Sequence, residues 1–509
     1  MMSFDLTDRA WLPVVGPDGT EEVSLRDAFR RGRSLRGLAL TFAPEEVAVT
    51  RILIAVLQAA MRGPRSDDER ARWLEHPEEV IDAVVGYLDE WRDRFDLFDA
   101  TRPFLQQTVA EDAAKTATIA ALRLDWASGN NATLFDHHVD GVPPALDPGT
   151  AVRALITTLH FQPGGGVSKP FNRTDSPGTK ALSVLVQGRT LWETLVANAA
   201  APRPVVANDD GFGAPSWERP LPGQPDDGGV AADLAPDRAG STPRGWLDRL
   251  TWRSRAIELL PADDGMVRHC RIHQHLKLID GGTGDPFHAV EYDQQTGAAS
   301  LVRVRSGTRI WRSADAVLHG VSTVDQRPRS AVAQGLRTLE LHGAPRPQVL
   351  VAGLEVNQAK IAEARSASLP LSADLLADEA RLGLVGGLRE IAEQGAIALR
   401  NACLAYQSAS GAERDLRVAD TWQVPYWATL GHAFPQWLER LADEAPDDGG
   451  EALRGTWGDE VRRRAREALD ERHSADVVDP RAWKAHAVAR TAFHKALRSI
   501  PSSPKENVA

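Results

Sequence analysis

The sequence predicts an α+β fold in which a large mixed N-terminal domain is followed by a C-terminal four-helix bundle. Short β-branched runs between Gly and Asp turns occur before residue 370, and long alanine- and leucine-rich segments with helical spacing follow it. With 509 residues, the chain is longer than one hydrophobic core usually supports. We therefore predict two domains, residues 1–369 and 370–509, with a boundary near Pro370.

The N-terminal domain is predicted to begin with a β-hairpin and a short helix. A Pro-Asp-Gly turn at residues 17–19 separates two extended runs, residues 11–15 and 21–23. Ser24 is a favoured N-cap for the helix that follows, and Pro44 suits the first turn of the next helix because its φ angle is fixed. Further helices are expected at residues 78–94 and 150–160, and strands between residues 246 and 361.

The middle and the end of the chain differ in composition. Residues 199–245 are rich in Pro, Gly, Asp and Ala without apolar periodicity, which is typical of a long surface excursion. After Pro370, four helices joined by short connections are expected, and an up-and-down bundle is their simplest arrangement. These helices are predicted at residues 371–406, 426–444, 450–472 and 480–499.

The charge of the chain limits how it can bind nucleic acid. A net charge of −11 disfavours tight, autonomous binding to DNA, because phosphate neutralisation normally requires a basic surface. Charge is uneven, however, and residues 301–350 contain eight arginines. This stretch is compatible with a phosphate-facing surface and equally with an ordinary solvated surface of ion pairs.

The cysteine count and the hydropathy pattern exclude other classes of protein. Two cysteines, Cys270 and Cys403, cannot form a disulfide framework. No segment is apolar over the length that a bilayer requires, and the first residues lack the features of a secretory signal. We therefore expect a cytoplasmic protein with no membrane partner.

Two strings contain residues that can bind metals. The Asp-His-His string at residues 136–138 is similar to an element of metal-dependent phosphoesterases, but such enzymes need further carboxylates on strand ends, which we do not find. Cys270, His273 and His275 suit zinc but supply three ligands at most. We favour histidines that alternate on the outer face of a strand. Since phosphate loops and nucleophile elbows are also missing, we expect no catalytic residue, no metal and no cofactor.

Two further strings are less easily explained by structure alone. Gly164, Gly165 and Gly166 provide a backbone without side chains, which something bulky can approach closely, although a plain flexible loop is the alternative. Residues 353–360 follow a β-branched run and precede Ile361, which predicts a polar hairpin tip that needs no function of its own.

In their order and spacing, these strings resemble the CasA family, the large subunit of the type I-E CRISPR surveillance complex Cascade. The resemblance spans nearly the whole chain, including the helical C-terminal region. It is carried by Trp11-Leu12-Pro13-Val14, Arg102-Pro103-Phe104-Leu105-Gln106, Asn130-Asn131-Ala132-Thr133-Leu134-Phe135-Asp136-His137, the triple glycine, and Gly353-x-x-x-Asn357-Gln358-Ala359-x-Ile361-x-Glu363-x-Arg365.

The resemblance implies a non-catalytic subunit that recognises the protospacer-adjacent motif in double-stranded DNA, starts strand separation and helps recruit the helicase-nuclease. Its partners would be the other Cascade subunits, the CRISPR RNA, duplex target DNA and that effector. In this family the motif is read from the minor groove, whose hydrogen-bonding pattern is degenerate, so several related motifs should be accepted.

The resemblance also implies roles for individual residues. Gly164, Gly165 and Gly166 match the glycine loop that lies against the minor groove of the motif. Gln358, flanked by Asn357 and Ala359, matches the wedge. The family's lysine finger has Arg268 as its nearest basic counterpart here, and the family's zinc-binding cysteines are not carried over. The loop that contacts RNA and neighbouring subunits corresponds to Asn130, Asn131, Ala132, Thr133, Leu134 and Phe135.

Two alternatives from other classes remain at this point. One is a structural or adaptor protein whose helical bundle binds a partner and which never touches DNA. The other is the metal-dependent phosphoesterase. Metal-dependent cleavage by the purified chain would favour the enzyme, and loss of DNA recruitment without loss of assembly would favour recognition.

Overall fold

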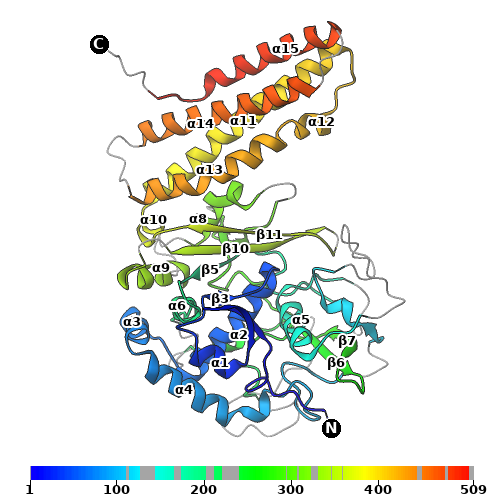
Figure 1. The fold of residues 1–509 in the computed structure, drawn as a ribbon, viewed down its shortest axis with the longest axis vertical. Helices are drawn as coiled ribbons and strands as arrows, with labels where there is room; N and C mark the ends of the chain where they lie inside the picture. The colour runs from blue at the N-terminus through cyan, green and yellow to red at the C-terminus, as the bar shows by residue number, and fades with distance from the viewer. Residues whose placement is uncertain are drawn as a thin grey trace. The chain divides into compact units, whose positions relative to one another are not determined.

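The structure, a computed structural model, mixes helices and strands along the chain, which confirms the α+β prediction (Figure 1). Residues 1–310 and 319–373 form one compact unit, and residues 311–318 and 374–509 form a second. The structure describes residues 2–109, 114–126, 144–165, 173–201, 211–219, 240–293, 295–305, 309–321, 331–344, 347–357, 359–443, 450–475 and 480–503.

The strands of the first unit form small sheets with the orders β2-β1-β3, β11-β10-β5, β4-β7-β6 and β8-β9, and every ladder between these described strands is antiparallel. Antiparallel pairing agrees with a sequence in which strands and helices do not alternate regularly. The strands are β1 (Leu12–Gly16), β2 (Gly19–Val23), β3 (Gly37–Leu38), β4 (Ala117–Thr118), β5 (Ser183–Gln187), β6 (Arg255–Pro261), β7 (Val267–Gln274), β8 (Val290–Tyr292), β9 (Ala299–Leu301), β10 (Gln348–Asn357) and β11 (Lys360–Pro370).

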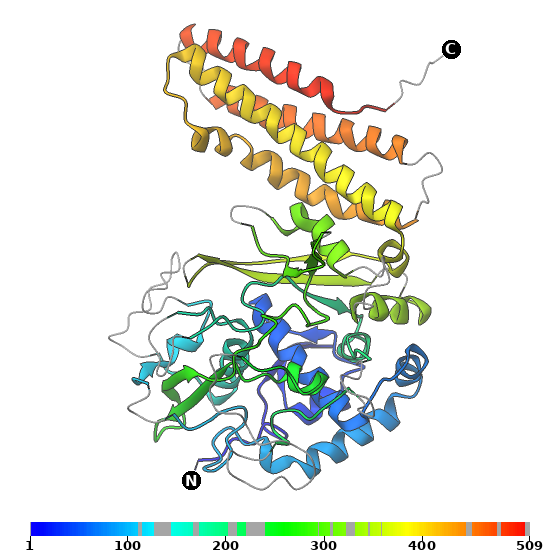
Figure 2. The ribbon, with the colours of Figure 1, turned by 180° about the vertical axis from the view of Figure 1, so that it is seen from behind.

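The helices of the first unit surround α2, which is apolar on nearly all faces and buried along most of its length. A helix without a polar face belongs inside a core, and α2 packs against α4, α5, α6 and α7 (Figures 1 and 2). The helices are α1 (Leu25–Arg30), α2 (Ala43–Met61), α3 (Asp67–Glu75), α4 (Pro77–Glu90), α5 (Pro148–Phe161), α6 (Leu191–Ala197), α7 (Trp246–Leu250) and α9 (Ala331–Leu341).

The N-terminal elements confirm the local predictions. Strands β1 and β2 pair in the predicted hairpin, from Leu12 opposite Val23 to Gly16 opposite Gly19. The Ser24 hydroxyl accepts a hydrogen bond from the backbone N–H of Asp27 at 3.1 Å, as expected of an N-cap.

One prediction for the middle of the chain is wrong. Helices α8 (Ala314–Val321) and α9 lie in the stretch from which only strands were expected. In α9, Val332, Leu336 and Leu339 are buried at helical spacing, and this periodicity outweighs the β-branched content. In the described residues 211–219 of the predicted surface excursion, Phe212 and Trp217 are buried. Single buried aromatic residues like these do not produce the apolar periodicity from which burial is predicted in a sequence.

A polar cluster lies inside the core of the first unit. Arg51 on α2 donates two hydrogen bonds to Asp285, at 3.1 and 2.7 Å, and both side chains are almost fully buried. The Nδ1 atom of His288 lies 2.9 Å from the carbonyl oxygen of Gly282. The rings of His288 and His160 are 5.6 Å apart, and their Nε2 atoms have no hydrogen-bond partner among the described residues.

The second unit is built around the long helix α11, which packs against α12, α13, α14 and α15. Asp378 caps the start of α11, and Gly411 ends it with a positive φ of 79°. No helix in the described part of the chain is long and apolar enough to cross a membrane. The helices are α10 (Ala373–Ala377), α11 (Glu379–Ser410), α12 (Leu416–Thr421), α13 (Val424–Asp443), α14 (Glu451–Ala475) and α15 (Pro480–Ala496).

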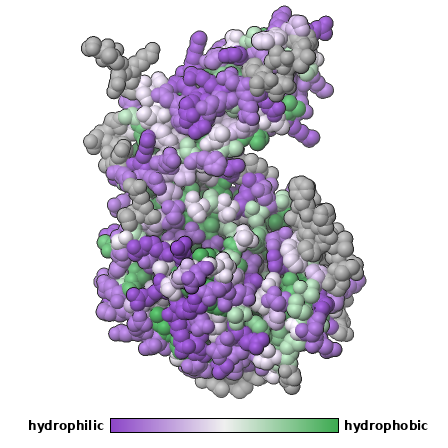
Figure 3. All heavy atoms as spheres, in the orientation of Figure 1, coloured by the Kyte–Doolittle hydropathy of each residue, from purple (hydrophilic) through white to green (hydrophobic). Residues whose placement is uncertain are grey.

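The segment 311–318 contributes an aromatic anchor to the second unit. The ring of Trp311 lies 4.9 Å from that of Phe434 and 5.6 Å from that of Trp427, centroid to centroid. On the face of this unit seen in Figure 3, hydrophilic side chains predominate.

Candidate nucleic-acid interface

The hairpin predicted around residue 358 is present in the first unit as strands β10 and β11 (Figure 1). Its base is anchored, because β10 also pairs with β5 and its residues 349–354 are buried. Beyond a register shift at Glu355 and Val356 the strands become exposed, and Asn357 pairs with Lys360 at the tip. The result is an anchored stem with an exposed polar end. Gln358 lies outside the described residues.

Two ion pairs of one arginine stabilise the outer half of this hairpin. Arg365 on β11 pairs with Glu355 on β10 at 3.1 Å and with Glu363 on its own strand at 2.6 Å. Across the ladder Glu355 faces Glu363, and Arg365 lies diagonal to Glu355, opposite Gly353. Its guanidinium therefore offsets the repulsion between the two carboxylates. The tip residue Ala359 has a positive φ of 65°, which is uncommon for a residue with a side chain.

The glycine loop follows α5, and hydrogen bonds between its backbone and residues 173–175 hold it in place. The N–H of Gly164 donates to the Asp175 carboxylate at 2.7 Å, and the N–H of Gly165 donates to the carbonyl oxygen of Arg173 at 2.8 Å. In return, the Arg173 Nε–H donates to the carbonyl oxygen of Gly165 at 3.1 Å. Gly165 has a φ of +121°, which L side chains rarely adopt. Gly166 lies outside the described residues.

The glycine loop and the hairpin tip meet. A Cβ atom placed on Gly165 would lie 2.8 Å from the Cβ atom of Ala359, closer than real Cβ atoms approach each other. A Cβ atom on Gly164 would meet the backbone of residues 173–175 at 2.8 to 2.9 Å. The two strings that the sequence singled out, far apart in the chain, therefore form one surface feature. The fold itself therefore requires glycine at position 165.

A buried layer beneath the loop escaped the sequence analysis. The Arg255 guanidinium donates to the carbonyl oxygens of Thr174 and Gln162, and the Gln274 Oε1 atom accepts from the Thr174 N–H at 2.7 Å. Burial, with the charge of Arg173, lowers the pKa of Arg255 to about 9. The polar string 173–175, a few residues after the glycines, was the available signal, but its partners on β6 and β7 follow only from tertiary structure.

Arg268 lies on β7, in an ion pair with Asp264 at 2.6 Å. The hydrogen bond from Arg268 lowers the pKa of Asp264 to about 2. Exposed pairs of this kind contribute little stability, so the guanidinium can exchange Asp264 for another anion. The loop containing Asn130, Asn131, Ala132, Thr133, Leu134 and Phe135 lies outside the described residues.

The cysteine and histidines considered for zinc are buried, so the prediction of outward-facing histidines is wrong. Cys270 is fully buried, and burial raises the pKa of its thiol to about 12. His273 and His275 are buried as well, because the end of β7 is covered by other parts of the unit. Among the described residues, no group of three or more His, Cys, Asp or Glu is placed to hold a metal. The Asp-His-His string at residues 136–138 lies outside them.

Two other features are explained by the fold. Arg312, from the arginine-rich stretch, pairs with Glu393 at 2.8 Å and lies 3.9 Å above the ring of Trp427.

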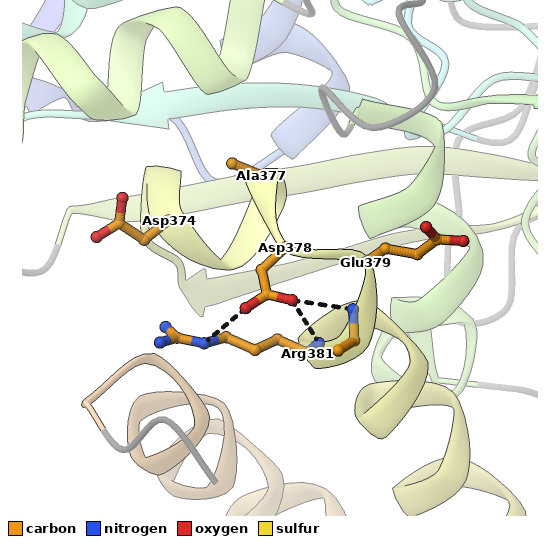
Figure 4. A pocket seen from close by; sticks show the side chains of 6 residues that line it. Asp374, Ala377, Asp378, Glu379 and Arg381 are labelled. Carbon is orange, nitrogen blue, oxygen red and sulfur yellow. Dashed lines mark hydrogen bonds and ion pairs between the residues drawn. The ribbon is translucent and has the colours of Figure 1, made fainter. Parts of the chain in front are cut away.

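A hollow of about 750 Å³ lies at the start of α11 (Figure 4). There the Asp378 carboxylate accepts from the N–H groups of Ala380 and Arg381, at 2.9 and 3.1 Å, and pairs with the Arg381 side chain at 3.2 Å. These are the ordinary bonds of a helix N-cap.

Comparison with known proteins assigns the chain to a family. A model of the CRISPR-associated protein Cse1 family matches residues 5–468. The CRISPR-associated protein CasA/Cse1 of Thermus thermophilus is 30% identical over 477 residues, which are 89% of this chain and 90% of the relative.

Solved structures share the fold. The structure of Thermus thermophilus CasA (Cse1) gives a TM-score of 0.79 at 24% identity and covers 98% of this chain and 100% of that chain. Cse1 from Acidimicrobium ferrooxidans gives 0.77 at 24% identity, with 98% of each chain covered. A chain of a CRISPR RNA-guided surveillance complex gives 0.72 at 21% identity, with 97% and 100% covered. The family resemblance seen in the sequence is confirmed, and the chain belongs to the CRISPR-associated protein Cse1 family, also called CasA.

Proposed function

We propose that this chain is a non-catalytic subunit of a CRISPR RNA-guided surveillance complex, Cascade, in which it recognises a short motif beside the target in duplex DNA and starts strand separation. The observation that carries the proposal is the contact between the glycine loop and the exposed tip of the β10–β11 hairpin. One structural match is itself a chain of a surveillance complex. Its partners would be the other subunits, the CRISPR RNA and the target duplex.

In this proposal the glycine loop contacts the minor groove and the hairpin tip separates the base pairs. The backbone of Gly164 and Gly165 approaches the floor of the minor groove, which a side chain at either position would prevent. Asn357 and Ala359 shape the tip, and Gln358 enters the base step beyond the motif. Arg268 contacts a DNA phosphate after leaving Asp264. Affinity comes mainly from base pairing by the guide, so the acidic chain does not have to bind DNA tightly alone.

The direct test compares guide-loaded complex with and without this chain on duplexes that vary only beside the target. We expect the chain to confer binding on some adjacent sequences and not on others. The adaptor alternative predicts that assembly depends on the chain while the adjacent sequence makes no difference. In the complex, the loop from Asn130 to Phe135 would contact the CRISPR RNA and neighbouring subunits.

Gln358→Ala should slow opening of an intact duplex about tenfold, because a wedge offsets part of the few kcal/mol that unstacking a base step requires. On a target already mismatched beside the motif, the same substitution should have little effect, since the unstacking has been provided in advance. Rates of strand opening on the two targets can be followed by fluorescence of a base analogue. Equal defects on both would show that Gln358 provides ordinary contact affinity.

We also propose that the second unit is a four-helix bundle that helps to receive the helicase-nuclease. Trp483 on α15 is 64% exposed, and exposed tryptophans are favoured anchors of protein interfaces. Trp483→Ala should therefore reduce target degradation severalfold without changing motif-dependent binding. Leu341→Ala, at an apolar residue of the first unit that is 74% exposed, is the control and should leave degradation unchanged. Full degradation by the Trp483 variant would contradict this role for α15.

A further inference from the structure

Four arginine side chains line one small cavity in the first unit. Arg94 and Arg102 come from the segment that follows α4, Arg219 from the segment before α7, and Arg253 from the connection between α7 and β6. The cavity has a volume of about 40 Å³, which corresponds to roughly three water positions and suits a tetrahedral oxyanion. Its lining, as far as the structure describes it, contains no acidic side chain.

The walls of the cavity are rigid. Phe104 stacks on Trp217 with ring centroids 5.9 Å apart, and both belong to the lining. Leu105 has a positive φ of 55°, a strained conformation that the surrounding structure has to maintain. The Gln106 side chain fixes this turn, because it donates to the Leu97 carbonyl oxygen at 2.7 Å and accepts from the Leu259 N–H at 2.8 Å.

The charges near the cavity are predominantly positive. Asp248 forms a buried ion pair with Arg219, and Asp93, the partner of Arg94 at 3.2 Å, is exposed to solvent. Burial, with the charge of Arg219, lowers the pKa of Arg253 to about 10. Burial and the charges of Arg253 and Arg219 also lower the pKa of His275 to about 3, so that this nearby imidazole stays neutral.

A hydroxyl group in the lining lacks a partner. Ser216 is 8% exposed, and its Oγ atom is buried without a hydrogen-bond partner among the described residues. Buried polar atoms are normally satisfied, so a bound species that accepts from this hydroxyl would complete the site. A phosphate oxygen accepts strong, charge-assisted hydrogen bonds from guanidinium groups and can accept from a hydroxyl at the same time.

We propose that this cavity binds a phosphate group through Arg94, Arg102, Arg219, Arg253 and Ser216. The ligand is either free inorganic phosphate or the terminal phosphate of a nucleic acid, since a volume of about 40 Å³ excludes anything larger than the phosphate itself. The site is separate from the glycine loop and the hairpin tip, and it does not depend on the function proposed for them.

The test is a thermal unfolding measurement on the full chain in inorganic phosphate and in chloride of equal ionic strength. Phosphate should raise the unfolding temperature by at least about 2 °C at about 10 mM, because a ligand of the folded state stabilises it by mass action. Equal unfolding temperatures in the two salts would overturn the proposal.

Variants show whether the shift arises in the cavity. Ser216→Ala and Arg102→Gln should each reduce the phosphate-dependent shift at least twofold, and Ser216→Ala does so without changing any charge. Arg33→Gln removes an exposed arginine that pairs with Glu78 at 3.0 Å and should keep the full shift. An equal loss in all three variants would mean a general surface effect and would contradict the cavity as the site.

Oligonucleotides distinguish the two sources of the ligand. A short RNA with a 5′-phosphate that stabilises the chain more than the same RNA without it would identify a nucleic-acid end. Stabilisation by inorganic phosphate alone would identify a free anion. Either result supports the phosphate site provided that the Ser216 variant reduces it, and a shift that this variant leaves unchanged contradicts the site.

Discussion

Gly165→Ala should weaken motif-dependent binding of the assembled complex at least about tenfold. The new Cβ atom would lie 2.8 Å from that of Ala359, on a backbone with a φ of +121°. Residues in such conformations are strained by about 1–3 kcal/mol, so the loop would spend most of its time in other conformations. Apparent affinity falls by the fraction of molecules that can still bind. Binding to duplexes with permissive and non-permissive motifs measures the effect.

A double-mutant cycle separates the contact from the backbone strain. Ala359→Gly removes the atom that the new side chain would meet, so the double variant should recover part of the lost binding and retain the part caused by φ. Gly343→Ala is the matched control, because Gly343 has a φ of +84° with open space around its Cβ position. It should leave motif reading intact. Undiminished discrimination in the Gly165 variant would show that neither contact nor strain matters for recognition.

The free energy of unfolding should fall steeply as the pH decreases below about 6.5. Burial, with nearby positive charge from Arg51 or Arg253, lowers the pKa values of His160, His275 and His288. The unfolded state therefore binds more protons than the folded state in this range, and stability is lost as the pH falls. Each such group contributes a slope of about 1.4 kcal/mol per pH unit. The three together give a slope of at most about 4 kcal/mol per pH unit.

Denaturant unfolding near pH 7 and near pH 5.5 tests this dependence. His275→Leu should reduce the pH slope by about 1.4 kcal/mol per unit, since one proton is no longer taken up on unfolding. Neither ring nitrogen of His275 has a hydrogen-bond partner among the described residues, so its removal leaves no protein group newly unsatisfied. His432 is exposed, and His432→Leu should keep the original slope. A slope unchanged in the His275 variant would mean that this histidine is already charged in the folded protein.

Local patterns in the sequence predicted local structure well. The hairpin around residue 358 followed from a polar string between two apolar runs, and the Ser24 cap followed from residue type and position. The contact between Gly165 and Ala359 could not be predicted in this way, because tertiary packing alone brings these segments together. The same reason applies to Trp217, which fills the core from a segment that looks like a surface loop.

The histidines at the end of β7 and directly after it illustrate a second limit. Alternation along a strand predicts opposite faces, but it does not say which faces remain open once other segments cover the sheet. His273 and His275 were expected outside and are inside. Burial of such residues is decided by neighbours that a reading of one strand does not contain.

The chain enters the second unit twice, first at residues 311–318 and again at residues 374–509. The two parts are fitted closely, because a Cβ atom on Gly431 would lie 2.7 Å from the Trp311 Nε1 atom. A chimera that exchanged residues 374–509 alone with a relative would separate this indole from the glycine that accommodates it. For recombination between genes and for protein engineering alike, the transferable module has to include residues 311–318.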